Sequence, residues 1–469
     1  MEFWTNTHPE SAVAVIDPRD GSQWSYGELA SDVANLRDKL PNLGRKSLGV
    51  LVARNGYLCL TVYLAALQSN CALILLDGAL NPDLLREFLA TYQPDWLFAD
   101  HCDTDIAGFR PSQTAQPGFF ENESLRDLEL HPDLALLLTT SGSTGSPKLV
   151  RLTRANLTAN AKSIAHYLDL TSEERPITSL PMSYSYGLSV INSHLAVGAS
   201  IVFTGDGVLQ RSFWDSLERY QCSSFAGVPY TYQMLLQTGL LKSKGATLRM
   251  ITQAGGRLEE RYIQQMYDLA RSRGWRFYVM YGQTEATARI SYVPFENLGS
   301  KVGSVGIPVP GGALSIDEAT EELIYQGSNV MMGYAESRED LKKGDDLEGV
   351  LRTGDTARRD DDGYFYITGR LKRFLKMFGK RFNLDDVEKL LNKRLDVSMA
   401  CYGRDDLLLV AVEHSDNTDA IRKLICEMFD LPQPAVKVIA VAELPRTANG
   451  KLDYKRLGEV SAENSVAVG

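Results

Sequence analysis

The sequence predicts an α/β protein, in which a large N-terminal α/β sandwich domain with a β-rich subdomain is followed by a small mobile α+β domain. Three observations predict this fold. Short apolar runs alternate with helical patterns along the first part of the chain, which is typical of parallel strands joined by crossover helices. A stretch rich in Gly, Pro and Asp turns follows. The last part of the chain alternates amphipathic helix patterns with strand patterns.

The N-terminal domain is predicted from its alternating runs. Strand patterns lie at residues 48–53, 72–76, 96–99 and 134–138, and helix patterns at residues 57–68 and 83–91. The strand rhythm resumes at residues 177–180, 200–203, 223–226, 250–252 and 276–280. Turn pairs such as Gly311-Gly312 and Asp362-Gly363 then indicate short strands between residues 303 and 367.

A different pattern begins after Arg370. Asn383 can cap a helix with acidic residues in its first turn, and Thr418 can cap a second helix with an apolar stripe at i, i+3, i+4 and i+7. Strand patterns lie at residues 407–412 and 436–441. We therefore expect domains at residues 1–370 and 371–469.

Composition limits the function. The 469 residues are 44% hydrophobic and 23% charged, as in a globular protein, and the net charge of −10 argues against binding a nucleic-acid backbone. A small anion is still possible in a local pocket. The six cysteines form no C-x-x-C pair, and neither a signal peptide nor a membrane span is indicated. We expect a cytoplasmic protein.

One segment has the composition of a phosphate-binding loop. An apolar strand runs into a stretch of hydroxyls and glycines that ends with Lys148, and it contains Thr140, Ser141, Gly142, Ser143, Thr144 and Gly145. Backbone N–H groups, hydroxyls and one lysine suit a polyphosphate. A flexible Ser/Gly loop is an equal alternative on composition alone. The P-loop pattern G-x-x-x-x-G-K-[ST] is absent, which disfavours a Walker-type ATPase or kinase.

Four further segments are weaker signals. Tyr281-Gly282-Gln283-Thr284-Glu285 and Ala254-Gly255-Gly256 each follow a strand, where α/β sheets bind ligands, and Glu285 could hold Mg²⁺. Asp355 and Arg370 could bind ribose hydroxyls, and an Asn-Gly turn presents Lys451. Taken singly, each could be a solvated turn.

Together, in this order, these motifs resemble the adenylate-forming superfamily of acyl- and aryl-CoA ligases, luciferases and peptide-synthetase adenylation domains. The matching segments are TTSGSTGSPK, AGG, YGQTE, TGD with GYFYITGR, GRLK and PRTANGK. The resemblance extends from Trp24 to Lys451 and implies a large domain that carries ATP and the acid, with a small domain that closes over it.

The resemblance also implies residue roles. Lys148 and its loop would bind the β- and γ-phosphates, and Thr284 the α-phosphate. Glu285 would hold Mg²⁺, and Lys451 would bridge the carboxylate and the α-phosphate. The remaining implied roles are adenine contacts for Gly255, Gly256 and Tyr281, ribose contacts for Asp355 and Arg370, and a hinge at Lys372.

The acid pocket is expected from the segment Pro181 to Leu188. Tyr184, Tyr186, Gly187 and Val228 would line it, with Tyr184 at a position where the family often has His. No acidic residue occurs from Gly187 through Asn192 to meet an ammonium group, so an amino acid is disfavoured. A fatty or aryl acid is expected.

The resemblance implies ATP- and Mg²⁺-dependent formation of an acyl-AMP with release of pyrophosphate, followed by transfer to a thiol, with coenzyme A as the expected co-substrate. The first alternative acceptor is the phosphopantetheine arm of an acyl carrier protein. The second alternative, from another class, is a nucleotide-binding scaffold without catalysis. The partners are thus a small carboxylic acid and a thiol.

Overall fold

The structure is a computed structural model, and its residues group into two compact units. It describes residues 2–5, 7–99, 106–112, 117–124, 129–139, 148–371, 373–377, 380–395, 397–404, 406–413, 417–429, 431–447, 452–454 and 456–458. The first unit comprises Met1–Leu314 and Tyr325–Leu351, and the second comprises Ser315–Ile324 and Arg352–Gly469. The expected boundary after Arg370 falls inside the second unit, so a lid that begins there stays a prediction.

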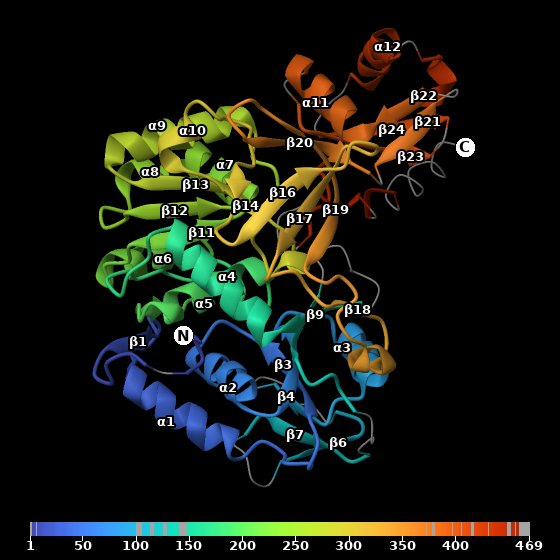
Figure 1. Ribbon diagram of the computed structural model, residues 1–469. Helices are drawn as coiled ribbons and strands as arrows, with labels where there is room; N and C mark the ends of the chain where they lie inside the picture. The colour runs from blue at the N-terminus through green and yellow to red at the C-terminus, as the bar shows by residue number, and fades with distance from the viewer. Residues whose placement is uncertain are drawn as a thin grey trace. The chain divides into compact units, whose positions relative to one another are not determined.

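An eight-stranded sheet forms the base of the first unit (Figure 1), with the strand order β18-β9-β8-β4-β3-β5-β7-β6. Its central strands β8, β4, β3 and β5 are parallel, as predicted, and its edges are antiparallel. The bounds are β3 Ser47–Ala53, β4 Cys71–Asp77, β5 Trp96–Phe98, β6 Phe109–Pro111, β7 Phe119–Asn122, β8 Leu134–Thr139, β9 Leu149–Thr153 and β18 Gly333–Ala335.

A five-stranded sheet, β11-β12-β13-β14-β15, lies in the same unit, with β11, β12 and β13 parallel. Its strands are β11 Ser224–Gly227, β12 Met250–Gln253, β13 Arg276–Tyr281, β14 Ser291–Val293 and β15 Ile307–Pro308. A small third sheet joins β1 Val13–Ile16, β2 Gln23–Ser25 and β10 Ile201–Val202.

Helices α4 and α5 lie between the two larger sheets (Figure 1). Leu157 and Ala161 of α4 pack into the core of the eight-stranded sheet, whereas Ile164 and Tyr167, one to three turns later, pack against the five-stranded sheet. One helix therefore buries apolar residues on two faces, as a helix in the middle layer must. The helix bounds in this unit are α1 Tyr26–Arg37, α2 Tyr57–Gln68, α3 Pro82–Tyr92, α4 Arg154–Tyr167, α5 Ser185–Ala196, α6 Arg211–Arg219, α7 Pro229–Thr238, α8 Leu240–Ser243, α9 Glu260–Arg273 and α10 Phe295–Leu298.

The strand predicted at residues 177–180 does not form. Pro176 and Ile177 make only isolated bridges, to Ser224 and Val202 respectively. Pro176 has no N–H to donate, so a continuous ladder cannot extend through it. The amides of Ile177 and Thr178 instead donate to different strands, β11 through Ser224 and β10 through Val202. The segment connects two sheets rather than extending one.

The second unit holds most of a four-stranded sheet and the helical end of the chain. The sheet order is β16-β17-β19-β20, with bounds β16 Gly312–Ile316, β17 Glu322–Gly327, β19 Val350–Arg359 and β20 Phe365–Arg370. The elements that follow are β21 Phe374–Met377, β22 Lys380–Asn383, α11 Leu384–Arg394, β23 Met399–Arg404, β24 Leu407–Glu413, α12 Thr418–Phe429 and β25 Val436–Val441. The predicted helices and strands of this α+β region are confirmed, and β21, β22 and β23 are additional strands.

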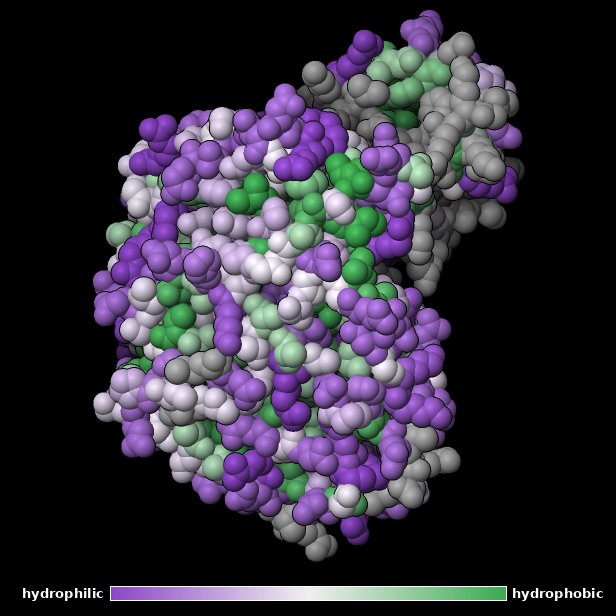
Figure 2. Space-filling view, in the orientation of Figure 1, coloured by the Kyte–Doolittle hydropathy of each residue, from purple (hydrophilic) through white to green (hydrophobic). Residues whose placement is uncertain are grey.

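Hydrophilic residues cover most of the face shown in Figure 2. Among the described residues, the exposed large hydrophobic side chains are Leu209, Tyr230 and Val350. No helix within the described part of the chain is both long enough and apolar enough to cross a membrane.

Candidate active site

The predicted Tyr281-to-Glu285 segment lies at the carboxyl end of β13, beside the parallel strand β12. A Cβ atom at Gly282 would lie 1.9 Å from the carbonyl oxygen of Ala288, so only glycine lets the chain fold back at this point. Tyr281 is half-buried and accepts a hydrogen bond from the side chain of Gln283 over 3.2 Å. The chain thus turns sharply after the strand.

The turn that follows holds Thr284 and Glu285 in a short 3-10 helix, η1 (Thr284–Ala286). Immediately after it, Thr287 and Ala288 have positive φ angles of 52° and 94°. Such a backbone is strained for residues with a Cβ atom and persists only when surrounding contacts fix it.

Asn329 supplies those contacts. Its side-chain amide donates 2.7 Å hydrogen bonds to the backbone carbonyl oxygens of both Ala286 and Arg289. The backbone carbonyl oxygen of Asn329 accepts a 2.6 Å hydrogen bond from the hydroxyl of Thr287. Asn329 is buried, and its Oδ1 atom accepts from Tyr325 over 2.7 Å. The sequence analysis missed this residue, because an asparagine after Gly and Ser reads as an ordinary turn.

Tyr334 connects Glu285 with Lys148. The Tyr334 hydroxyl donates a 2.8 Å hydrogen bond to Oε1 of Glu285, and Nζ of Lys148 lies 3.7 Å from the centroid of the Tyr334 ring. Burial and the neighbouring Glu285 charge raise the pKa of Tyr334, so its hydroxyl stays protonated and donates. Nζ of Lys148 also lies 3.8 Å from the exposed carboxylate of Glu336.

The register of β18 on β9 explains this arrangement. The strands are antiparallel, with Tyr334 opposite Val150 and Ala335 opposite Leu149, so Lys148 is carried to the Tyr334 ring. The sequence analysis did not identify Tyr334, because its partner Glu285 lies 49 positions away and the apolar segment around it has no motif. The predicted loop residues Thr140, Ser141, Gly142, Ser143, Thr144 and Gly145 lie outside the described residues.

The predicted Ala254-Gly255-Gly256 turn follows β12. Gly255 has a φ of +85°, and a Cβ atom there would lie 2.5 Å from the Tyr184 hydroxyl and 3.2 Å from Cγ1 of Val228. Glycine is therefore required at this position both by its backbone conformation and by close approach. The structure brings Gly255 together with two of the residues predicted for the acid pocket.

The start of α5 brings the remaining predicted pocket residues to the same region. The Ser185 and Thr284 hydroxyls lie 3.1 Å apart, and both residues are buried. The Tyr186 hydroxyl donates to the carbonyl of Thr252 in β12 over 2.8 Å. A Cβ atom at Gly187 would lie 2.2 Å from the carbonyl oxygen of Pro181, so glycine is required there as well.

In the second unit, Asp355 and Arg370 lie opposite each other on the antiparallel strands β19 and β20. Nε of Arg370 donates to Oδ1 of Asp355 over 3.1 Å. The side chain of Asp355 is 7% exposed and that of Arg370 is 61% exposed. The structure thus brings together the two residues predicted to bind ribose. Lys372 and Lys451 lie outside the described residues.

The layered α/β fold, together with a lysine, a tyrosine and a carboxylate at the ends of its strands, is that of an adenylate-forming enzyme. The family model described as AMP-binding enzyme matches residues 1–335, and the chain belongs to this family. The resemblance predicted from the motifs and the enzyme class are therefore confirmed.

Several curated relatives extend this match. An oxalate–CoA ligase of Arabidopsis thaliana is 29% identical over 360 residues, which span 71% of this chain and 69% of that protein. An indoleacetate–CoA ligase of Aromatoleum aromaticum is 28% identical and covers 91% of both chains. A D-alanine–D-alanyl carrier protein ligase of Staphylococcus aureus is 22% identical and covers 98% of both.

The fold is shared with a solved structure along nearly the whole chain. The o-succinylbenzoate coenzyme A synthetase of Bacillus subtilis, in complex with ATP and magnesium ion, matches with a TM-score of 0.75 and 19% identity. The match covers 96% of this chain and 97% of that one, so it includes the C-terminal region beyond residue 335.

Proposed function

We propose that the protein uses ATP to activate a carboxylic acid as an acyl-AMP and then transfers the acyl group to a thiol. A carboxylate oxygen of the acid attacks the α-phosphorus of ATP, and pyrophosphate leaves. The thiol then attacks the acyl carbonyl carbon, and AMP leaves. The observation that carries the proposal is the contact of Tyr334 with both Glu285 and Lys148.

These residues suit ATP with Mg²⁺. Glu285 is a half-buried carboxylate whose Oε1 accepts a single hydrogen bond, from Tyr334, in the described residues. Mg²⁺ is commonly held by one carboxylate together with phosphate oxygens. When bound, the metal would neutralise phosphate charge, and Lys148, whose ammonium lies over the Tyr334 ring, would do the same. Thr284, beside Glu285, would contact the α-phosphate.

The roles of the remaining predicted residues are part of the same proposal, supported by the motif resemblance. Asp355 and Arg370 bind ribose, Lys451 of the lid at residues 371–469 neutralises the attacking carboxylate and the α-phosphate, and Lys372 is the hinge. Rotation at such a hinge would withdraw Lys451 after adenylation, so that two steps share one site in alternation. Removal of a single charge-stabilising group from an active site typically slows the reaction, so we expect Lys451→Ala to lower the rate of adenylation about 10²–10³-fold.

Coenzyme A is the proposed acceptor, supported by the two CoA ligases among the relatives. The carrier-protein ligase supports an acyl carrier protein as the alternative. We place the enzyme in the cytoplasm, supported by the five described cysteines, all of which are free thiols.

Pyrophosphate release over a panel of acids, with and without coenzyme A, tests the proposal. Glu285→Gln keeps the side-chain shape but removes the charge, and we expect it to lower the rate about 10²-fold or more. Glu339→Gln, at an exposed glutamate of the same unit, is the matched control and keeps the native rate. Tight AMP binding without turnover of any acid would instead indicate a silent nucleotide-binding scaffold.

A further inference from the structure

Arg289 is a buried arginine beside Tyr186 of the predicted acid pocket. The residue is 1% exposed and follows the turn that holds Glu285. Its guanidinium carbon lies 4.2 Å from the centroid of the Tyr186 ring, and its Nη1 atom lies 3.4 Å from the carbonyl of Ala288. Within the described residues it forms no ion pair, and its Nε–H has no acceptor. A buried charge without a partner carries a large desolvation cost.

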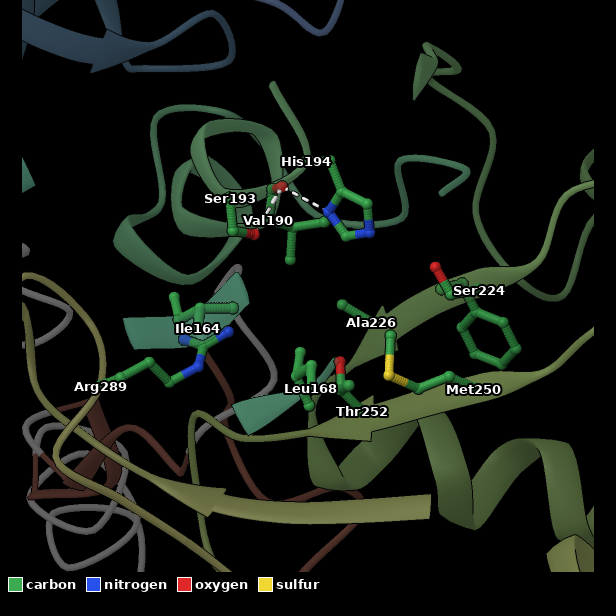
Figure 3. Close-up of a pocket in the computed structure, with 11 residues that line it drawn as sticks. Ile164, Leu168, Val190, Ser193, His194, Ser224, Ala226, Met250, Thr252 and Arg289 are labelled. Carbon is green, nitrogen blue, oxygen red and sulfur yellow. Dashed lines mark hydrogen bonds between the residues drawn. The ribbon is translucent and has the colours of Figure 1, made fainter. Parts of the chain in front are cut away.

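The guanidinium lines a small cavity (Figure 3). The cavity has a volume of about 10 Å³ and is formed by residues of α4, α5, β11 and β12, with Ser193, His194, Met250 and Thr252 among them. Figure 3 shows Arg289 and His194 reaching it from different elements. None of the lining residues carries a carboxylate. The lining is mostly apolar, so the Arg289 guanidinium is the charged group at its wall, and no anion among the lining residues faces it.

The positive charge of this cavity belongs to Arg289 rather than to His194. Burial lowers the pKa of His194 to about 4, against a partial increase from its hydrogen bond to Val190, so the imidazole is neutral at pH 7. The Arg289 charge also reaches the predicted acid pocket, where it offsets part of the increase that burial causes in the pKa of Tyr184 and of Tyr186.

Side-chain contacts connect the cavity with residues of the predicted acid pocket. Tyr186, beneath the Arg289 guanidinium, bonds to Thr252, which lines the cavity. Ser185, the preceding residue, touches the hydroxyl of Thr284 over 3.1 Å. These contacts link the proposed α-phosphate contact at Thr284 to Arg289 through two consecutive residues of α5.

We infer that the substrate is an acid with a second anionic group, a carboxylate or a sulfonate, and that Arg289 binds this group while the first carboxylate is adenylated. The inference rests on the proposed function and adds the substrate class. The cavity is about the size of one water molecule, so an anionic group reaches Arg289 only if neighbouring side chains move, and the flexible Met250 side chain in the cavity wall can supply this movement. An apolar tail at this place would leave the guanidinium without a counter-ion.

Matched pairs of acids test the inference. Succinate is compared with butyrate, and benzene-1,4-dicarboxylate with benzoate, by calorimetric binding and by pyrophosphate release. We expect the native protein to bind the dianion about 10²-fold more tightly than the monoanion in at least one pair. The monoanion lacks the second anionic group and therefore the charged hydrogen bond to Arg289. Arg289→Gln abolishes this preference, so that kcat/KM falls much more for the dianion than for the monoanion, and Arg289→Lys restores part of it.

The outcomes separate the two proposals. A preference for the monoanion in both pairs, or equal losses for both members of a pair in Arg289→Gln, would overturn the inference and show that Arg289 only supports the fold. Dianion binding that depends on Arg289 without pyrophosphate release from any acid would retain the inference and overturn the proposed function. Thermal unfolding of both variants checks that they fold.

Discussion

The hydroxyl of Tyr334 holds Oε1 of Glu285 by a hydrogen bond of 2.8 Å. The two residues are 49 positions apart and come from different sheets of the first unit, β18 and the end of β13. A carboxylate that is held in this way is already oriented before a cation arrives, which lowers the cost of binding the cation.

Tyr334→Phe removes this hydrogen bond and keeps the ring beneath Lys148. We expect adenylation to fall about 10-fold or more, with a higher Mg²⁺ requirement, because partners of a metal ligand typically contribute 10–100-fold. The measurement is pyrophosphate release as a function of Mg²⁺ concentration. Tyr334→Leu, which also removes the contact with the Lys148 ammonium, should show the larger loss. An unchanged Mg²⁺ requirement in Tyr334→Phe would exclude the orienting role.

Asn329→Ala should destabilise the first unit and inactivate the enzyme together. The substitution removes the donor to the carbonyl oxygens of Ala286 and Arg289, and each buried polar group left without a partner costs about 1–3 kcal/mol. Urea unfolding measures the loss. The exposed Asn297→Ala is the control and should stay within about 0.5 kcal/mol of the native protein. Native stability in Asn329→Ala would contradict the role assigned to this side chain.

Gly255→Ala should raise the KM for ATP and lower stability, because the new methyl group would meet the Tyr184 hydroxyl at 2.5 Å on a left-handed backbone. Gly239→Ala separates the effect of the new contact from the effect of the left-handed backbone. Gly239 has a similar φ of +68°, but a Cβ atom there meets nothing within 4 Å. We expect about 1 kcal/mol of destabilisation in Gly239→Ala and a native KM. Equal behaviour of the two variants would show that backbone strain alone is responsible.

His194 should make stability depend on pH in mild acid. Its pKa is about 4 in the folded protein, chiefly because of burial, and about 6.5 when unfolded. The unfolded chain thus takes up a proton first, so the contribution is fully present above pH 6.5 and is lost as the pH falls towards 4. The loss should reach about 3 kcal/mol. His194→Gln should flatten this part of the curve, whereas exposed His166→Gln should not.

The fold was predictable from local patterns in most places. The strand at residues 48–53 and the helix at 57–68 coincide with β3 and α2 within one residue, because both are continuous apolar runs of suitable length that are separated by polar and turn residues. The segment 177–180 failed because Pro176 prevents a ladder that its apolar residues alone would favour. Gly282 and Gly255 were identified only as members of motifs that follow strands, and the structure adds that close contacts require glycine at both positions.

The supporting residues of the site could not be predicted in the same way. Asn329 contacts Ala286 and Arg289, and Tyr334 contacts Glu285. These partners are distant in the sequence and come together only when the sheets fold. Arg289 presented a related difficulty. The sequence shows an arginine after the YGQTE motif, but not that its guanidinium is buried and forms no ion pair among the residues that the structure describes. Such facts depend on tertiary packing, which local patterns do not encode.

The antiparallel register of β18 on β9 makes the site sensitive to chain length. Side chains alternate between the faces of a strand, so one residue inserted just before Gly333 would turn Tyr334 to the opposite face if the hydrogen-bond ladder were kept. Lys148 and Glu285 would both remain in place, yet each would lose the same neighbour. Natural or engineered insertions in this strand should therefore inactivate the enzyme without altering any residue of its recognised motifs.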